Sequence, residues 1–222
     1  MIEDDVLYLD NHLLVMNKVA GLLTQPSGTE QENLQEKAKE WLKEKYGKPG
    51  RVFLEAVHRI DKPVSGVVLF ARTSKALSRL QKLLREGDCK KSYWALVEGV
   101  PLKDSGTLEH YLIHGKHRAS VVKKDDQYGK FARLHYRVCR RFKGKAFLSI
   151  DLETGRYHQI RVQLSAWGYP IIGDRKYGAS DDCDGKKIAL HHRSLEIFHP
   201  VGGTELKFIA EPSPQGYFCD LL

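Results

Sequence analysis

The chain has 222 residues, 41% of them hydrophobic, and its formal net charge at pH 7 is +8. This length and composition suffice for one sizeable hydrophobic core. No apolar run approaches the roughly 20 residues that cross a bilayer, and the N-terminus, MIEDD, is acidic, so we expect neither a membrane protein nor an exported one.

The N-terminal third predicts a β-hairpin and then a helix. Residues 6–9 and 13–16 are short apolar runs separated by an Asp-Asn pair, which is typical of a tight turn. Apolar side chains recur at helical spacing over residues 34–42, and Gly47 can end that helix in the left-handed conformation.

The middle of the chain continues this alternation. Residues 67–71 form the apolar run VVLFA, which predicts a buried strand. Thr73 or Ser74 can cap a helix that ends before Gly87, because the leucines between them recur at helical spacing. Residues 92–99, SYWALVEG, predict the next strand.

The C-terminal half predicts a second hairpin and a helix. Residues 132–138 alternate between apolar and basic side chains, which indicates a half-buried antiparallel strand with a basic outer face. A KGK turn leads into residues 147–152, and residues 157–167 have helical spacing before Gly168.

Strands mostly follow one another directly, which favours an α+β fold. We expect a central mixed, mainly antiparallel sheet with flanking helices and loops. No linker rich in Pro, Gly or Ser divides the chain, so we expect a single domain over residues 1–222.

The cysteines do not form a recognisable metal-binding pattern. Cys89, Cys139, Cys183 and Cys219 are far apart in the sequence and no signal peptide precedes them, which favours reduced thiols in a cytoplasmic protein.

The positive charge is concentrated in one segment. Residues 116–145 contain eleven Lys or Arg and two Asp, a net charge of +9, which leaves 25 basic and 26 acidic residues, or −1, elsewhere. Such a basic field suits a phosphate backbone, whose neutralisation releases counterions. From charge alone, a solvated cationic hairpin is an equally good interpretation.

Two further stretches combine charge with apolar sequence. HRIDKPVSG places Asp61 among basic and titratable residues, where an Asp is usually a turn residue. In ETGRYHQIR, Arg161 falls beside the apolar stripe of the predicted helix and therefore needs an anion. Asp61 is a candidate partner for Arg161.

Three stretches, HRIDKPVSG, KKSYWALVEG and ETGRYHQIRVQLSAWGYPIIGDRKYG, resemble in this order the signature motifs of the RluA-type pseudouridine synthases, which isomerise uridine to pseudouridine in RNA. The similarity runs from about residue 6 to residue 195. It implies the pseudouridine synthase catalytic fold, with an active-site cleft across the sheet. The chain differs from the family at Val64, where Thr is frequent, and at Val19, where Pro is frequent.

The resemblance also implies roles for individual residues. Asp61 matches the catalytic aspartate, Tyr93 the active-site tyrosine and Arg161 the basic residue that pairs with the aspartate. Arg59 matches the arginine that helps to hold the target uridine out of the RNA helix. A carboxylate in a pocket that excludes water loses solvation, and a paired guanidinium would restore the preference for its ionised form.

RNA is the expected partner, and neither a metal nor a cofactor is expected. His191, His192 and His199 lack a recognisable ligand spacing, and the chain has no phosphate-binding glycine loop. We also expect no separate N-terminal RNA-binding domain and a monomer. His58 either contacts RNA or bonds the backbone and fixes its loop. The residues expected to bind RNA are His58, Arg59, Lys123, Lys124, Arg133, Arg137, Arg140 and Arg141.

Two other functions remain open at this point. One is a non-catalytic RNA-binding or ribosome-assembly factor on the same fold, although binding alone does not need a buried carboxylate that faces a polyanion. The other is a hydrolase that releases the base. Whether the substrate is ribosomal or transfer RNA is also open.

Overall fold

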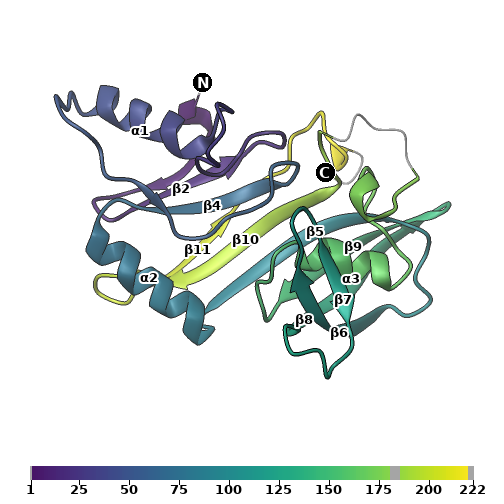
Figure 1. The fold of residues 1–222 in the computed structure, drawn as a ribbon. Coiled ribbons are helices and arrows are strands. Elements are labelled where there is room, and N and C mark those ends of the chain that lie inside the picture. Colours follow the sequence, from purple (N-terminus) through teal and green to yellow (C-terminus); the bar gives the residue numbers. More distant parts are fainter. Residues whose placement is uncertain (1, 181–185, 220–222) are drawn as a thin grey trace. The chain divides into compact units, whose positions relative to one another are not determined.

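The computed structural model describes residues 2–180 and 186–219 (Figure 1). The chain divides into two compact units. The first unit comprises Met1–Cys89 and His192–Pro212, and the second comprises Lys90–His191 and Ser213–Leu222.

The first unit is a sheet with two α-helices. Its strands lie in the order β1-β2-β4-β10, with β11 beside β10 and β3 beside β4. Four of these pairings are antiparallel: β1 with β2, β2 with β4, β3 with β4, and β10 with β11. The elements are η1 (Ile2–Asp5), β1 (Val6–Leu9), β2 (Leu13–Lys18), α1 (Leu34–Lys45), β3 (Glu55–Ala56), β4 (Ser65–Ala71), α2 (Ser74–Glu86), β10 (Leu190–Phe198, from His192 in this unit) and β11 (Glu205–Ile209).

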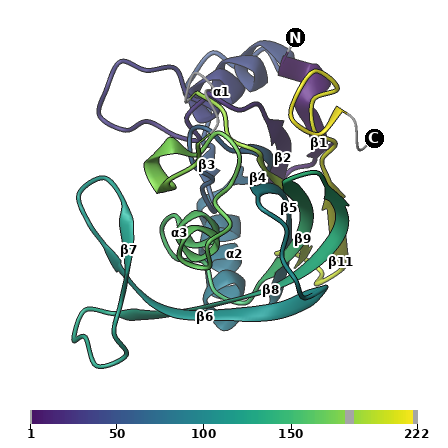
Figure 2. The same ribbon diagram turned by 90° about the vertical axis from the view of Figure 1, so that its right-hand side faces the viewer.

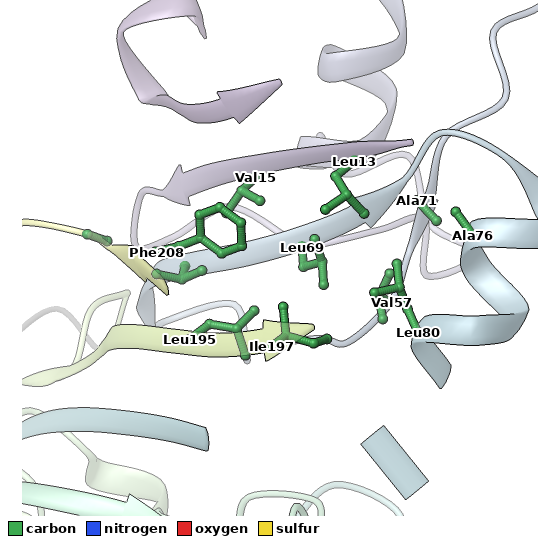
Figure 3. Close-up of a cluster of buried hydrophobic side chains, with 12 residues drawn as sticks. Leu13, Val15, Val57, Leu69, Ala71, Ala76, Leu80, Leu195, Ile197 and Phe208 are labelled. Atoms are coloured by element: carbon green, nitrogen blue, oxygen red, sulfur yellow. The ribbon is translucent and has the colours of Figure 1, made fainter. Parts of the chain in front are cut away.

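The core of the first unit joins α2 to one face of this sheet. Figure 3 shows Leu13 and Val15 of β2, Leu69 of β4 and Leu80 of α2 in one cluster with side chains of β10 and β11. These aliphatic side chains are fully buried, and their burial supplies the main driving force for folding of this unit.

The second unit is an antiparallel sheet around one helix. Its strands lie in the order β5-β9-β8-β6-β7, and Figure 2 shows α3 on the concave side of the β6, β8 and β9 strands. The elements are β5 (Cys89–Glu98, from Lys90 in this unit), β6 (Ser105–His114), β7 (Ala119–Val122), β8 (Lys130–Phe142), β9 (Lys145–Leu152), α3 (Gln159–Ala166) and η2 (Arg175–Tyr177).

The α+β class and the mainly antiparallel sheet are confirmed. The hairpin turn at Asp10 is also confirmed, since its carboxylate accepts N–H bonds from His12 and Leu13. Thr73 caps α2 by accepting from the Ala76 N–H, and Gly87 ends the helix in the left-handed conformation. Within the described ranges, no helix has both the length and the apolar character needed to cross a membrane.

Two features of the second unit differ from the sequence analysis. The β6 and β7 strands had no predicted counterpart, and α3 begins at Gln159 rather than at residue 157. The helix starts late because His158 has a left-handed backbone, with φ of 53°, which no helical residue adopts.

The start of β4 requires a glycine, because Gly66 lies against β10. Gly66 has φ of 116°, and a Cβ at this position would lie 2.3 Å from the carbonyl oxygen of His192. Gly66→Ala should therefore lower the free energy of unfolding by more than about 3 kcal/mol, since backbone strain and a backbone clash combine. Urea unfolding followed by circular dichroism measures the change.

Gly87→Ala is the matched control for this substitution. Gly87 also has a positive φ, of 85°, but no atom lies within 4 Å of its added Cβ. Its substitution should cost about 1 to 2 kcal/mol from backbone strain alone. Equal costs for the two variants would contradict a close approach of β4 to β10.

Candidate active site

Asp61 lies in the loop between β3 and β4, in the first unit. The loop turns sharply after it, because the Val64 N–H donates to the Asp61 carbonyl at 3.0 Å. The neighbours of Asp61 alternate in exposure: Ile60 is buried, whereas Arg59 and Lys62 are exposed. The half-buried Asp61 carboxylate thus stands at the edge between core and solvent.

The residues on either side of Asp61 are bonded to the segment that follows β2. The Thr24 hydroxyl donates to the Ile60 carbonyl at 2.8 Å and accepts from the Ile60 N–H at 3.3 Å. The Gly21 N–H donates to the Lys62 carbonyl at 2.8 Å. The Lys18 ammonium is fully buried and donates to the same carbonyl at 3.2 Å. The backbone around Asp61 is therefore fixed on both sides.

His58 connects the same loop to β4. Its Nε2 atom accepts the N–H of Leu69 at 3.2 Å, and its ring packs edge-on against the ring of His192, with 5.4 Å between centroids. His192 in turn donates from Nδ1 to the Val67 carbonyl at 2.7 Å. These contacts favour the loop-fixing role of His58 over the contact with RNA.

Arg59 has the opposite environment. Its side chain is exposed and forms no hydrogen bond or ion pair with any residue in the described ranges. Its guanidinium can therefore contact a phosphate or a base without first breaking an ion pair. The expected RNA contact of Arg59 stays a prediction.

Tyr93 is buried in the second unit, on β5, with 7% of its surface exposed. Its partner across the ladder is Ile150 of β9, which in turn pairs with Tyr136 of β8. Partners across an antiparallel ladder share a face, so these three side chains lie on the same face. Trp167, next to α3, packs on the Tyr136 ring with 4.3 Å between centroids, so this is the face that α3 covers.

Arg161 of α3 forms a buried, two-point ion pair with Asp174. Its Nε and Nη2 atoms donate to the two carboxylate oxygens at 2.7 and 2.8 Å. The Arg161 and Asp174 side chains are only 5% and 1% exposed. Arg161 has the anion that its buried position requires, and inside its own unit Asp174 supplies it. Pairing of Arg161 with Asp61, which belongs to the other unit, stays a prediction.

Tyr177 packs against this ion pair and bonds His158. The Tyr177 ring lies 5.0 Å from the Arg161 guanidinium carbon, and its hydroxyl bonds the Ala119 N–H and His158 Nδ1, each at 2.8 Å. Burial raises the pKa of Tyr177, so its hydroxyl keeps its proton at neutral pH. The left-handed backbone of His158 is thus tied to the Arg161 environment through one tyrosine.

The basic side chains of β8 lie mainly on the face opposite Tyr93. Successive residues of a strand alternate between faces, and Tyr136 shares the face of Tyr93, so Arg133 and Arg137 point the other way. Arg140 also points that way. It pairs with Phe147 of β9, which is an odd number of residues from Ile150 and therefore lies on the opposite face of the sheet. The predicted RNA contacts of Arg137 and Arg140 stay predictions, on a face that α3 does not cover.

Two of the predicted RNA-binding arginines already have carboxylate partners. Arg133 bonds Glu109 at 2.6 Å and Glu153 at 3.2 Å, and Arg141 bonds Asp104 at 2.6 Å. These three acidic residues lie outside the segment 116–145 in sequence and offset part of its positive charge in space. A phosphate would have to displace a bonded carboxylate, which makes Arg133 and Arg141 weaker candidates than the exposed Lys123 and Lys124.

The three histidines considered as metal ligands have separate environments. His192 bonds the Val67 carbonyl, His199 bonds Asp10 at 2.9 Å, and His191 packs on Phe218 in the second unit. Cys139 is an exposed free thiol, and Cys183 lies outside the described residues.

Sequence reasoning missed Lys18, Asp174, Tyr177 and His158. In the sequence, Lys18 resembles the exposed polar end of a strand. Only its complete burial in the structure indicates a special role. Asp174 follows Gly173 and resembles a turn residue, so the one available signal was the unmatched charge of Arg161.

Comparisons with known proteins agree on one family. A family model described as RNA pseudouridylate synthase matches residues 12–166. A ribosomal large subunit pseudouridine synthase D from Pseudomonas aeruginosa is 34% identical over 97% of this chain and 70% of its own length. The dual-specificity RNA pseudouridine synthase RluA of Haemophilus influenzae is 33% identical over 93% of this chain and 92% of its own.

The fold has a close counterpart among solved structures. The structure titled human RNA pseudouridylate synthase domain containing 4 superposes with a TM-score of 0.80 at 23% identity, over 96% of this chain and 90% of that one. At this identity the likeness concerns the fold alone.

The buried pair of Arg161 and Asp174 generates a stability prediction. Asp174→Asn keeps the shape of the side chain but leaves a guanidinium without its carboxylate in the interior, so the free energy of unfolding should fall by about 3 to 5 kcal/mol. The exposed pair of Lys82 and Glu86 is the control, and Glu86→Gln should change stability by less than about 1 kcal/mol. Similar losses in both variants would show that the buried pair is not structurally important.

Proposed function

The chain belongs to the RNA pseudouridylate synthase family, and from this premise we propose that Asp61 is the carboxylate that acts on the ribose of a target uridine, assisted by Tyr93 and Arg161. The family is one of enzymes that isomerise uridine in RNA. The observation that carries the proposal is the doubly anchored loop that holds Asp61 half-exposed at the edge of a core.

The reaction needs a carboxylate but no redox change. The bond between C1′ of the ribose and N1 of uracil breaks, the base turns, and a bond forms between C1′ and C5. The proton on C5 is then lost, and N1 gains one. Because uracil leaves as a delocalised anion, no second carboxylic acid is needed to protonate it, in contrast to sugar leaving groups.

Two roles for Asp61 fit this chemistry. Its carboxylate either adds to C1′ as a nucleophile or takes a proton from the neighbouring ribose carbon. Both roles require the ionised form and a fixed direction of approach. The bonds that fix the carbonyls of Ile60 and Lys62 support the second requirement.

Tyr93 and Arg161 are proposed to complete the site. The Tyr93 ring would pack on the uracil, and its hydroxyl could exchange a proton near C5. Arg161 would pair with Asp61, and its two bonds to Asp174 restrict the guanidinium to one orientation. Arg59, which is exposed, would hold the flipped nucleotide out of the stack.

The proposed substrate is a structured RNA. The name of one relative contains the words ribosomal large subunit, which supports ribosomal RNA as the substrate class. Transfer RNA is the second candidate. We propose that the chain acts as a monomer in the cytoplasm, where a thiol such as that of Cys139 stays reduced. Light scattering at micromolar concentration tests the monomer.

Asp61→Ala tests the proposed reaction. The protein is incubated with pooled unmodified ribosomal and transfer RNA, and pseudouridine is mapped at nucleotide resolution. The parent should modify defined uridines, whereas Asp61→Ala should modify none, because the carboxylate has no substitute in the loop.

Asp88→Ala is the matched control, since Asp88 is an exposed carboxylate in the same unit, and it should retain full activity. Free uracil as the product would point to a hydrolase instead. RNA binding without pseudouridine in any RNA class would favour the assembly factor.

The turn between β7 and β8 offers a separate test of RNA binding. Lys123 and Lys124 are exposed there and have no side-chain partner in the described ranges. Replacing both by Ala should weaken RNA binding and reduce the slope of log K against log salt by about 0.7 to 0.9 per lost phosphate contact. Filter binding at several salt concentrations measures both effects.

The control is a double Ala variant in α1, which also removes two positive charges, at a distance from the turn in sequence. Lys37 and Lys39 of α1 form ion pairs with Glu32 and Glu36. If their double Ala variant lowers the salt slope as much as the Lys123 and Lys124 variant does, the effect comes from net charge and the turn makes no direct contact.

A further inference from the structure

Three aromatic rings form a column in the second unit. The ring of Tyr157, just before α3, stacks on the ring of His158 with 3.8 Å between centroids and 20° between planes. The ring of His114, the last residue of β6, lies 4.0 Å from the Tyr157 ring at an angle of 40°. Two rings this close to Tyr157 cannot share one of its faces, so the histidines cover opposite faces. The column therefore runs from His158 through Tyr157 to His114.

The inner end of the column is fixed in the core. His158 is buried, and its Nδ1 atom bonds the hydroxyl of Tyr177 at 2.8 Å. The same hydroxyl accepts the Ala119 N–H at the start of β7, and the Tyr177 ring lies 5.0 Å from the guanidinium carbon of Arg161. The column thus begins two contacts away from Arg161, a residue of the candidate active site, and its direction is fixed.

The outer end of the column is exposed. The His114 side chain is exposed and forms no hydrogen bond or ion pair with any residue in the described ranges. Tyr157 is 38% exposed although it lies between two rings. Folding gains little from a ring that stays in solvent, because little apolar surface leaves water. His114 thus ends a rigid stack at the surface with one aromatic face that Tyr157 does not cover.

The segments that build the outer end are basic. Residues 110–124 contain four Lys or Arg and no Asp or Glu, and residues 154–173 contain two Arg and no acidic residue. Lys116 and Arg118, in the turn that follows His114, are exposed. Lys116 has no ion-pair partner in the part of the chain that the structure describes. A phosphate near His114 can therefore meet a cation without displacing a carboxylate.

An aromatic face beside such cations suits a nucleotide of RNA. Unpaired bases stack on aromatic side chains, including histidine, and cations follow the phosphates beside them. Bases inside a helix have both faces covered by their neighbours. Loops and bulges, where a uridine is extruded at the lowest cost, also contain other nucleotides whose bases are unpaired.

We propose that the column is a stacking site for one unpaired base of the RNA substrate, distinct from the uridine that reacts. His114 offers the ring on which the base lies, Tyr157 and His158 fix that ring to the core, and Lys116 meets the adjacent phosphate. The inference rests on the proposed function, in which the substrate is a structured RNA and the reacting uracil packs on Tyr93. The site selects RNAs that have a second unpaired nucleotide near the target.

An abasic scan of the RNA tests the site. The probe is the RNA that the parent modifies or, if it modifies none, the ribosomal or transfer RNA that it binds most tightly. Each unpaired nucleotide except the reacting uridine is replaced in turn by an abasic one, and filter binding gives Kd. One position should weaken binding by about five- to hundredfold, the range for loss of one stacked base. His114→Ala should weaken binding of the intact RNA by a factor in the same range.

The two losses should not add, because both changes remove the same contact. His114→Ala should bind the RNA with that one abasic nucleotide no more weakly than the parent does. His114→Phe keeps a ring at the end of the column and should bind intact RNA within about twofold of the parent, because stacking does not require an imidazole. Losses that add at every abasic position would overturn the inference, since the ring would then act only within the protein.

Tyr46→Ala is the matched control. Tyr46 is 48% exposed and has cations over its ring, with Lys48 at 5.9 Å and Arg72 at 5.2 Å, but it belongs to the first unit. Its replacement should leave Kd unchanged. A loss equal to that of His114→Ala would contradict a specific site, because any exposed ring among cations would then contribute to binding.

Kinetics separates the site from the reaction. His114→Ala should raise KM and leave kcat nearly unchanged, because the stacked base lies away from the reacting atoms. A fall in kcat with the Kd of the parent would overturn the inference, since the column would then act through Arg161 and not on RNA. If the parent binds RNA but forms no pseudouridine, the proposed function fails, and the abasic scan still tests the stacking site through Kd.

Discussion

The cost of burying charge is the constraint on which the candidate site depends. An ion that leaves water must find compensating groups nearby, or it will neutralise or force the structure open. Lys18 meets this demand with three carbonyls, and Arg161 meets it with both oxygens of Asp174. Because each cation is compensated inside its own unit, each is also held in one place. The same contacts that make burial tolerable give these charges fixed positions.

Fixed positions require rigid supports, and the loop of Asp61 has them on both sides. On one side, the close approach of Gly66 to His192 brings β4 and β10 together, and His58 joins the loop to β4. On the other side, Thr24 and Lys18 bond the residues that flank Asp61. A carboxylate supported from two elements keeps its direction when substrate arrives, which is what a reaction at one ribose carbon requires.

Local rules predicted what depends on neighbours in sequence. The Asp10 turn, the Thr73 cap and the Gly87 end of α2 all follow from side-chain bonding or backbone freedom within a few residues. Motif resemblance supplied the family and the candidate roles of Asp61, Tyr93 and Arg161. Contacts distant in sequence were not predictable: the bond from Lys18 to Lys62 and the late start of α3 at His158 depend on tertiary packing.

The local net charge was also not predictable from the sequence, because it depends on partners that are distant along the chain. The segment 116–145 carries +9, yet Arg133 and Arg141 are matched by Glu109, Glu153 and Asp104, which lie outside it. The charge available to RNA is therefore smaller than the count along the sequence. Lys123 and Lys124, which have no carboxylate partner in the described ranges, are cations that a phosphate reaches without breaking an ion pair. Tyr128, in the same turn after β7, is 73% exposed. Cations beside an exposed ring suit unpaired nucleotides, which offer both phosphates and base faces, and an enzyme that must extrude its target base meets such nucleotides in loops and bulges.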